Sequence, residues 1–338
     1  MNKNYNHNAL DIFRIVATVQ VFFGHFITHF HLPQFTGAVY FLRGVPILFV
    51  LCGFLAAKSL DHSRAKDYLV RRAFRILPGF WVCIAVNTAI IFLIYTLPTL
   101  KDGVIYLVTQ FFGLNFYTGD WLRGYGVGTP NGVLWTIGVQ VQFFLLAPML
   151  HKLLRKLQLS ISAALMGVLT VLSIVIEKCA GILPEIGYKL IGVTVFPYLY
   201  FLVLGMAGWI YRDQIIPALE KVRWVILPVF ILWKLAEIYL PFPHLFDGVM
   251  YNTVTTLLTA LLIFAFAFRF RWRMKRDLTY GFYLYHMVFI NIVIHLGRKT
   301  LGFDLPSAAA VLFVTAAPIL AAWLSQKFIE TPAAKRMI

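Results

Sequence analysis

Long runs of apolar residues are the feature that most constrains how this chain can fold. A helix needs about 20 consecutive apolar residues to cross the hydrocarbon core of a bilayer. Backbone polar groups in lipid must be satisfied within the segment, so such runs predict transmembrane helices. Candidate spans lie at approximately 10–30, 38–58, 77–98, 133–151, 160–178, 189–210, 223–240, 249–268, 279–297 and 306–328.

The composition supports the same conclusion. Charged residues make up 13% of the chain and hydrophobic residues 60%, whereas soluble domains average about 25% charged residues. The sequence contains no visible internal repeat, low-complexity linker or shift in composition. We therefore expect an all-α integral membrane protein, a bundle of about ten transmembrane helices that forms a single domain over residues 1–338.

The formal net charge of +16 raises the question of nucleic-acid binding, but the basic residues lie in short connections between apolar segments rather than on a soluble face. Most of them fall on alternate connections, and the positive-inside rule then places both termini in the cytoplasm. The N-terminal "MNKNYNHN" leads into an apolar run without a small-residue cleavage site. We expect a retained first helix rather than a signal peptide.

Cofactor motifs are missing from the sequence. Cys52, Cys83 and Cys179 lie in apolar surroundings without CxxC spacing or histidines at zinc-finger distances, so buried free thiols are expected and no metal site is predicted. The phosphate-binding loop, the dinucleotide fingerprint and the HExxH zinc motif are also absent from the sequence.

Two polar residues share one face of the first predicted helix. Arg14 and His25 are eleven positions apart, which brings their directions to within about 20° of each other while separating them by ~16 Å along the helix axis. Ionisable residues inside spans indicate function by default. A snorkelling arginine and a structural histidine are the alternative interpretation.

A basic cluster precedes the third predicted span. In "YLVRRAFRILPGF", Arg71 and Arg75 are four residues apart, and Arg72 and Arg75 are three apart, so they share a helical face. Guanidinium groups bind phosphates with two parallel hydrogen bonds, which suits a multiply phosphorylated cytoplasmic ligand. Ordinary anchoring at the inner surface, or binding of anionic lipids, explains the cluster equally simply.

Further polar residues leave two interpretations open. Lys234 and Glu237 are three residues apart in the seventh span and can form a neutralising structural pair, or they can couple protons in a transporter. The long connection 99–132 is rich in glycine and aromatic residues, which suits either stacking on sugar rings or a position at the membrane interface.

Several segments, taken in order, carry a family resemblance. They are the Arg-and-His stretch "LDIFRIVATVQVFFGHF", "RGVPILFVLCGFL", the Arg-x-x-Arg segment "YLVRRAFRILPGFW", "GVLWTIGVQVQFFLLAPML", "LTYGFYLYH" and the terminal "FIETP". Together, over residues 9–332, they resemble the membrane-bound acyltransferase family 3. Two positions depart from the family pattern: Cys52 stands where serine is common, and Gln140 where glutamate is common. Because an amide cannot exchange a carboxyl proton, we expect a structural or polar-binding role for Gln140.

The resemblance implies an O-acyltransferase that moves acetyl from cytoplasmic acetyl-CoA to a hydroxyl of an envelope carbohydrate, such as lipopolysaccharide O-antigen or a polyprenyl-linked sugar. It implies the stand-alone type of the bacterial inner membrane, in contact with membrane lipids and without nucleic acid. The expected site residues are His25 and Arg14 for catalysis, Arg71, Arg72 and Arg75 for the donor, and Trp135, Gln140, Tyr283 and His286 as site lining.

The helix geometry suggests how such a transfer could work. Arginines at the cytoplasmic mouth would hold the donor phosphates, and neutral His25 would remove the acceptor's hydroxyl proton. The unperturbed imidazole pKa of ~6.5 leaves a usable base at neutral pH. A covalent acyl-histidine is the mechanistic alternative. The rival function is a transporter or flippase of a lipid-linked sugar or another polar solute, which would use Arg14, His25 and the Lys234–Glu237 pair.

Overall fold

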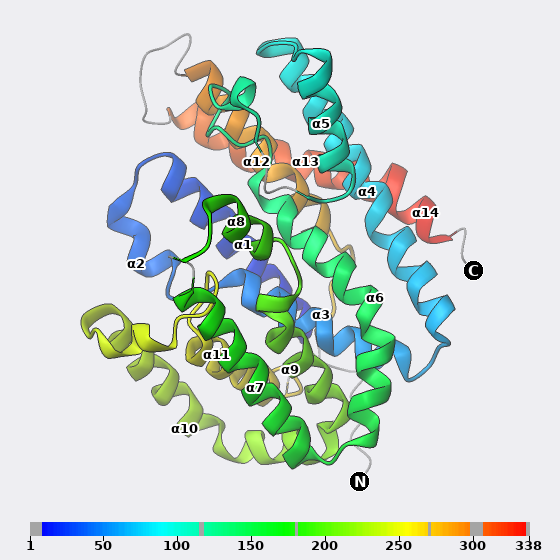
Figure 1. The fold of residues 1–338 in the computed structure, drawn as a ribbon, viewed down its shortest axis with the longest axis vertical. Helices are drawn as coiled ribbons and strands as arrows, with labels where there is room; N and C mark the ends of the chain where they lie inside the picture. The colour runs from blue at the N-terminus through cyan, green and yellow to red at the C-terminus, as the bar shows by residue number, and fades with distance from the viewer. Residues whose placement is uncertain (1–8, 115–117, 180–181, 270–271, 298–306, 336–338) are drawn as a thin grey trace. The chain divides into compact units, whose positions relative to one another are not determined.

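Helices account for the regular structure in the part of the chain that the structure describes. The computed structural model describes residues 9–114, 118–179, 182–269, 272–297 and 307–335 (Figure 1). Apart from its helices, this part holds one isolated bridge, between Asp247 and Asn252. The expected all-α membrane fold is therefore confirmed. The two chain ends, which we expect in the cytoplasm, lie outside the described residues.

The longer helices follow the apolar runs of the sequence. They are α1 (Leu10–His29), α3 (Gly44–Leu60), α4 (Ala65–Ile94), α5 (Leu100–Phe111), α6 (Trp135–Lys156), α7 (Leu159–Lys178), α8 (Glu185–Gly192), α9 (Leu199–Ile210), α10 (Arg212–Tyr239), α11 (Thr253–Phe266), α12 (Thr279–Leu296) and α13 (Ala308–Ser325). Short helices include α2 (Thr36–Val39), α14 (Thr331–Lys335), and the 3-10 turns η3 (Gly132–Leu134), η5 (Phe196–Tyr198) and η6 (Phe242–Phe246).

Seven of the described helical segments are long and apolar enough to cross a membrane, and an eighth candidate is a pair of helices bent by 52°. The bent pair, Glu185–Gly192 with Phe196–Ile210, covers the expected span 189–210. The expected spans 223–240 and 249–268 are also helical, in α10 and α11, but α11 has 14 residues and is short for a 30 Å core.

The third span begins earlier than the apolar run suggests. We expected residues 77–98, and α4 starts at Ala65 and ends at Ile94. Long basic side chains favour helices, and they can extend toward the membrane surface from a helix end. The arginine cluster therefore lies on the first turns of α4 rather than before it.

Contacts within the chain divide it into two units, which we describe separately. Unit 1 comprises Met1–Ala17, Arg43–Tyr68 and Val139–Lys275, and unit 2 comprises Thr18–Leu42, Leu69–Gly138 and Arg276–Ile338. Among the expected site residues, Arg14 and Gln140 belong to unit 1. His25, the three arginines of α4, Trp135, Tyr283 and His286 belong to unit 2.

Close packing of α3 against α9 forms the centre of unit 1. A Cβ atom on Gly53 would lie 2.0 Å from the carbonyl oxygen of Leu202, and one on Gly205 would lie 2.0 Å from that of Val50. Only glycine permits so close an approach of two helix backbones, as in many membrane helix pairs. Cys52, beside Gly53 on α3, is a buried cysteine outside any disulfide among the described residues.

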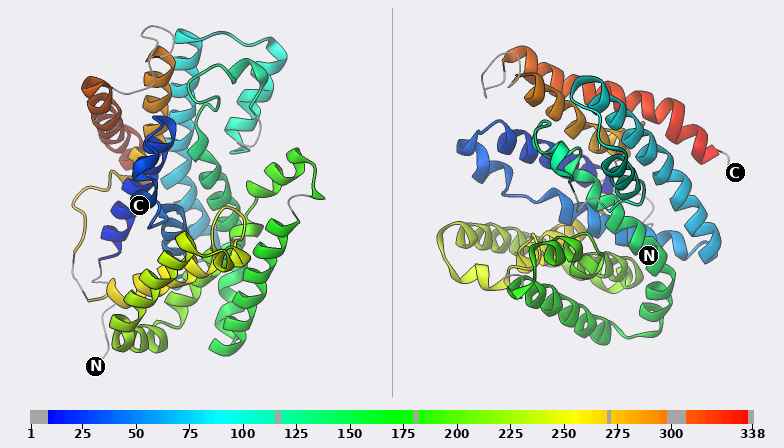
Figure 2. Two further views of the ribbon diagram at one scale, coloured as in Figure 1. Left: turned by 90° about the vertical axis from the view of Figure 1, so that its left-hand side faces the viewer. Right: turned by 45° about the horizontal axis from the view of Figure 1, so that its top comes forward.

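In unit 2, α12 and α13 run side by side (Figure 2). Asparagine side chains attach the connection that precedes α6 to α12. The Nδ2 of Asn291 donates to the carbonyl oxygens of Thr129, at 3.0 Å, and Pro130, at 2.9 Å, and Asn131 Nδ2 donates to that of Leu284 at 2.9 Å. These bonds fix the position of the chain where α6 begins, at Trp135.

Candidate active site

Three imidazole rings gather between α1 and α12 in unit 2. His25 and His29 are four residues apart on α1, so they share a helical face, and their rings stack with centroids 5.7 Å apart. The ring of His286, on α12, has its centroid 5.6 Å from that of His25. Phe22 and Phe282 pack against the His286 ring and make the surroundings apolar.

The hydrogen bond of His286 fixes its tautomer. The side chain is completely buried, and Nδ1 lies 3.2 Å from the backbone carbonyl oxygen of Phe282. A carbonyl oxygen only accepts, so Nδ1 must carry the hydrogen and Nε2 must present a lone pair. That Nε2 atom has no hydrogen-bond partner among the described residues. A buried acceptor without a partner is costly to a fold, which suggests that the position serves a ligand.

His25 makes no hydrogen bond within the part of the chain that the structure describes. It is half-buried, and its contacts there are ring contacts with His29 and His286. A neutral imidazole in that state offers both a donor and an acceptor. The structure thus brings together His25 and His286, two residues that are 261 positions apart in the sequence.

Tyr283 extends this group toward the start of α6. Its hydroxyl lies 2.8 Å from Thr136 Oγ1, and its ring packs edge-on against His286 with centroids 5.9 Å apart. Trp135, next to Thr136, is half-buried at the first position of α6. Tyr283 and His286 therefore lie in one cluster. Trp135 precedes Thr136, the residue whose hydroxyl contacts Tyr283. Gln140 lies further along α6 and belongs to unit 1.

The arginine cluster of α4 has an acidic partner that the sequence did not suggest. Arg75 Nη2 lies 3.5 Å from Asp277 Oδ2, with Arg75 60% exposed. The other carboxylate oxygen of Asp277 accepts hydrogen bonds from the hydroxyl and backbone amide of Thr279, at 2.5 and 3.2 Å. Arg71 is exposed and Arg72 half-buried. A single aspartate after the basic run "RWRMKR" was the signal available in the sequence.

Arg14 is paired within unit 1. Its Nη1 lies 3.4 Å from Asp11 Oδ1, one turn earlier on α1, and Asp11 Oδ2 accepts a hydrogen bond from the backbone amide of Met274 at 3.0 Å. The expectation that Arg14 and His25 lie on one helix is confirmed by α1. Asp11 was missed as its partner, although the three-residue spacing allows the pair.

Some aromatic residues of the connection 99–132 form a packed interior. Tyr106 and Tyr125 are buried together with Ile91 and Leu122 in one apolar cluster of unit 2, with the Trp121 ring edge-on to Tyr106. The buried tyrosines offer no surface to a sugar ring, whereas the side chains of Phe111 and Phe112 are 50% and 68% exposed. In the same described ranges, no group of three or more His, Cys, Asp or Glu side chains is placed to hold a metal ion.

Comparison with protein-family models identifies the family of this chain. The acyltransferase 3 family model, described as an acyltransferase domain, matches residues 7–326. Nodulation protein 10 of Rhizobium leguminosarum bv. viciae is 25% identical over 321 residues, which cover 86% of this chain and 85% of that protein. No solved structure matches. With a family match over nearly its whole length and a helical membrane fold, the chain belongs to the acyltransferase 3 family and is an O-acyltransferase.

Proposed function

We propose that this protein transfers an acetyl group from acetyl-CoA to a hydroxyl of a cell-envelope carbohydrate, with His25 as the general base. The acceptor would be a surface polysaccharide such as lipopolysaccharide O-antigen, or a polyprenyl-linked sugar, at the inner membrane of a bacterium. The observation that carries the proposal is the half-buried His25, which has no hydrogen-bond partner among the described residues and lies beside buried His286.

In the proposed reaction, the free ring nitrogen of His25 takes the proton of the acceptor hydroxyl as the oxygen attacks the thioester carbonyl carbon. A carbon–oxygen bond forms while the carbon–sulfur bond breaks. The thiolate of CoA leaves and takes the proton back from the imidazolium of His25. His25 therefore ends the cycle neutral, and the products are an acetyl ester and free CoA thiol.

His286 would support the charged intermediate state. Once His25 has taken a proton, both of its ring nitrogens carry hydrogen and can only donate. The lone pair on His286 Nε2, which lacks a partner among the described residues, can accept one of these hydrogens. An apolar setting strengthens such a hydrogen bond, and Phe22 and Phe282 provide one.

Arg71, Arg72 and Arg75 would bind the phosphates of the donor at the cytoplasmic mouth. They lie on the first turns of α4, and guanidinium groups suit phosphate geometry. The pair between Arg75 and Asp277 is long and largely exposed, so opening it costs little. Asp277 would therefore hold Arg75 in place without preventing its transfer to a phosphate.

Comparison of surface glycans tests the function. Mass spectrometry of glycans from a strain with the gene and one without it should differ by the mass of one acetyl group on the same sugar chain. If the sugar chain itself were missing from the surface without the gene, a flippase or transporter would explain the result and the proposal would fail.

Trapping experiments separate the two chemical routes. Purified protein is mixed with acetyl-CoA labelled in the acetyl group, quenched rapidly and examined for protein-bound label. Direct transfer predicts no bound label in the wild type. Label that is present in the wild type and absent in His25→Ala would replace the general-base step by a covalent acyl-histidine.

A further inference from the structure

A second polar site lies in unit 1, apart from the residues assigned to catalysis. It is a cavity of about 240 Å³ formed where α7 and α10 end and α11 begins. Its polar lining includes Arg43, Glu177, Glu237, Asp247 and Tyr251. At ~30 Å³ per liquid water molecule, the volume equals that of about eight waters, which is room for one sugar-sized ring.

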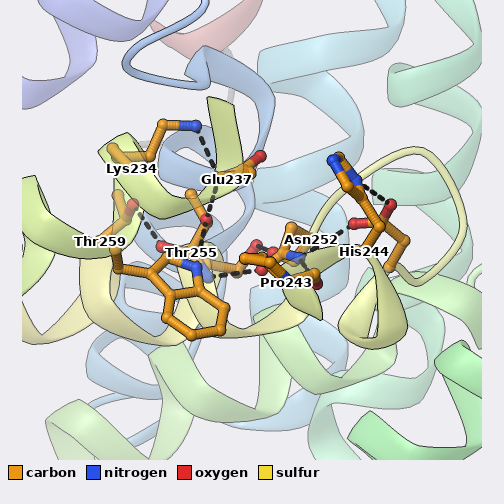
Figure 3. A network of polar contacts seen from close by, with 10 residues as sticks. Lys234, Glu237, Pro243, His244, Asn252, Thr255 and Thr259 are labelled. Atoms are coloured by element: carbon orange, nitrogen blue, oxygen red, sulfur yellow. Dashed lines mark hydrogen bonds and ion pairs between the residues drawn. The ribbon is translucent and has the colours of Figure 1, made fainter. Parts of the chain in front are cut away.

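The wall of the cavity is built around Asn252, which is itself buried (Figure 3). Its Nδ2 donates to the carbonyl oxygen of Pro243 at 2.8 Å and to Asp247 Oδ1 at 2.9 Å. Its Oδ1 caps α11 by accepting from the backbone amide of Thr255 at 3.0 Å. Asp247 Oδ2 also pairs with His244 Nδ1 at 3.0 Å. These bonds hold the connection between α10 and α11 in a fixed shape before any ligand binds.

Glu237 presents a carboxylate oxygen to this space. Its Oε2 accepts from Lys234 Nζ at 2.8 Å and from Thr255 Oγ1 at 2.6 Å (Figure 3). Lys234 is buried, and the pair places an opposite charge beside its ammonium group. Oε1 of Glu237 has no hydrogen-bond partner in the described ranges.

Glu177, at the end of α7, likewise has one carboxylate oxygen in a hydrogen bond and one without a partner in the described ranges. Its Oε2 accepts from the hydroxyl of Tyr188 at 2.6 Å, and Oε1 is left without a protein partner among the described residues. Both glutamates line the cavity. Two carboxylates with one oxygen each to spare require hydrogen-bond donors from whatever occupies the space.

The charges around the cavity select the class of occupant. A metal ion is disfavoured because the described residues hold no group of three suitable ligands. Arg43 in the lining offsets one carboxylate charge, and Lys234 behind Glu237 offsets another. Three carboxylates, those of Glu177, Glu237 and Asp247, oppose an anion. An uncharged ligand rich in hydroxyls fits, because each hydroxyl both donates and accepts and Tyr251 adds an aromatic surface.

We propose that this cavity binds one neutral sugar ring, with Glu177 and Glu237 accepting hydrogen bonds from its hydroxyls. The inference stands apart from the transfer proposed above, because it concerns binding without a donor and uses none of the residues assigned to that reaction.

Saturation-transfer NMR on the full chain in lipid nanodiscs tests the inference, with glucose and N-acetylglucosamine as neutral probes and glucuronate as an anion. The neutral sugars should bind, and glucuronate should bind poorly because three carboxylates line the cavity. Glu177→Gln should weaken the neutral sugars about tenfold, the effect of losing one charge-assisted hydrogen bond. Glu220→Gln, on α10 and outside the cavity lining, should change nothing.

Two further variants complete the test. Arg43→Gln should weaken glucuronate binding further relative to glucose, because it removes the cation of the lining. His25→Ala should bind sugars as the wild type does, which separates this inference from the catalytic proposal. Equal binding of charged and neutral sugars, no binding of any probe, or equal effects of Glu177→Gln and Glu220→Gln would each overturn the assignment.

Discussion

Replacing Asp61 with asparagine should lower the thermal stability of the protein by several degrees at neutral pH and by much less in acid. Asp61 follows α3 and is 10% exposed. Its carboxylate accepts from His151 Nε2 at 2.8 Å and from Trp209 Nε1 at 2.7 Å, and it forms an ion pair with Arg155. One side chain therefore joins the ends of α3, α6 and α9 within unit 1.

The size of the effect follows from burial. Removing one partner of a buried ion pair costs ~3–5 kcal/mol. Arg155 is 43% exposed, so water screens part of its charge, and asparagine keeps one acceptor oxygen for His151 or Trp209. We therefore expect a loss of about 3 kcal/mol, at the low end of that range. At about 2–4 °C per kcal/mol, the apparent Tm should fall by about 6–12 °C.

Unfolding can be measured by the labelling of buried cysteines. Cys52 and Cys83 are buried, so a thiol-reactive fluorophore in a thermal ramp reports their exposure on unfolding. Cys179 is less buried and is replaced by serine in every sample to remove early labelling. Asp67→Asn is the matched control, because Asp67 is an exposed aspartate in the first turn of α4 and should leave Tm unchanged.

The stability that Asp61 contributes should decrease as the pH falls into the acid range. Burial alone would raise the pKa of Asp61, but the hydrogen bonds from Arg155, Trp209 and His151 and the charge of Arg155 lower it further than burial raises it. A folded pKa below the unfolded value of ~3.9 means that the stability from Asp61 is complete above that value and is lost as pH falls toward the folded pKa. The gap in Tm between wild type and Asp61→Asn should therefore stay constant from about pH 7.5 to 5 and close below about pH 4. A gap below about 2 °C at neutral pH, or one that persists in acid, would refute this reasoning.

Three further predictions concern helix packing, donor binding and catalysis. Gly205→Ala should prevent folding or cost more than about 3 kcal/mol, because its Cβ would lie 2.0 Å from a carbonyl oxygen. Gly167 lies on α7, and a Cβ atom added to it would meet no atom within 4 Å beyond its own stretch of helix. Gly167→Ala should therefore raise Tm slightly in the same assay. Asp277→Asn should change KM for acetyl-CoA but leave kcat, because it removes an acidic partner of Arg75; an altered kcat would contradict this role. His286→Leu should lower kcat at least about tenfold with donor KM unchanged; normal kcat would make His286 a packing residue.

The apolar runs could predict the helices because the hydrocarbon core of a bilayer demands them. Apolar runs did not predict the helix boundaries that depend on charged residues or on packing against other segments. The first turns of α4 carry Arg71, Arg72 and Arg75, which an apolar window leaves out although they favour a helix. The bend between α8 and α9 and the short α11 depend on contacts with other segments, which hydropathy does not describe.

In the candidate sites, contacts within one helix could be predicted from the sequence, whereas contacts between distant segments could not. Spacing within one helix predicted the Lys234–Glu237 pair, which is present at 2.8 Å, because neighbours along a helix are fixed by its geometry. The approach of His286 to His25 joins residues from opposite ends of the chain, and no periodicity connects them. The pairing of Arg75 with Asp277 is of the same long-range kind and was missed for that reason.

The role of His25 is tested most directly by restoring a strain that lacks the gene with wild type, His25→Ala or His31→Asn. His31 is an exposed histidine with φ +54°, a conformation that asparagine tolerates, so it serves as the matched control. Surface glycans are then analysed by mass spectrometry, with the amount of each protein in the membrane measured in parallel. Wild type and His31→Asn should restore the species that is heavier by one acetyl group, whereas His25→Ala should not, although the protein is present. Near-normal acetylation with His25→Ala would contradict the assignment of His25 as the base.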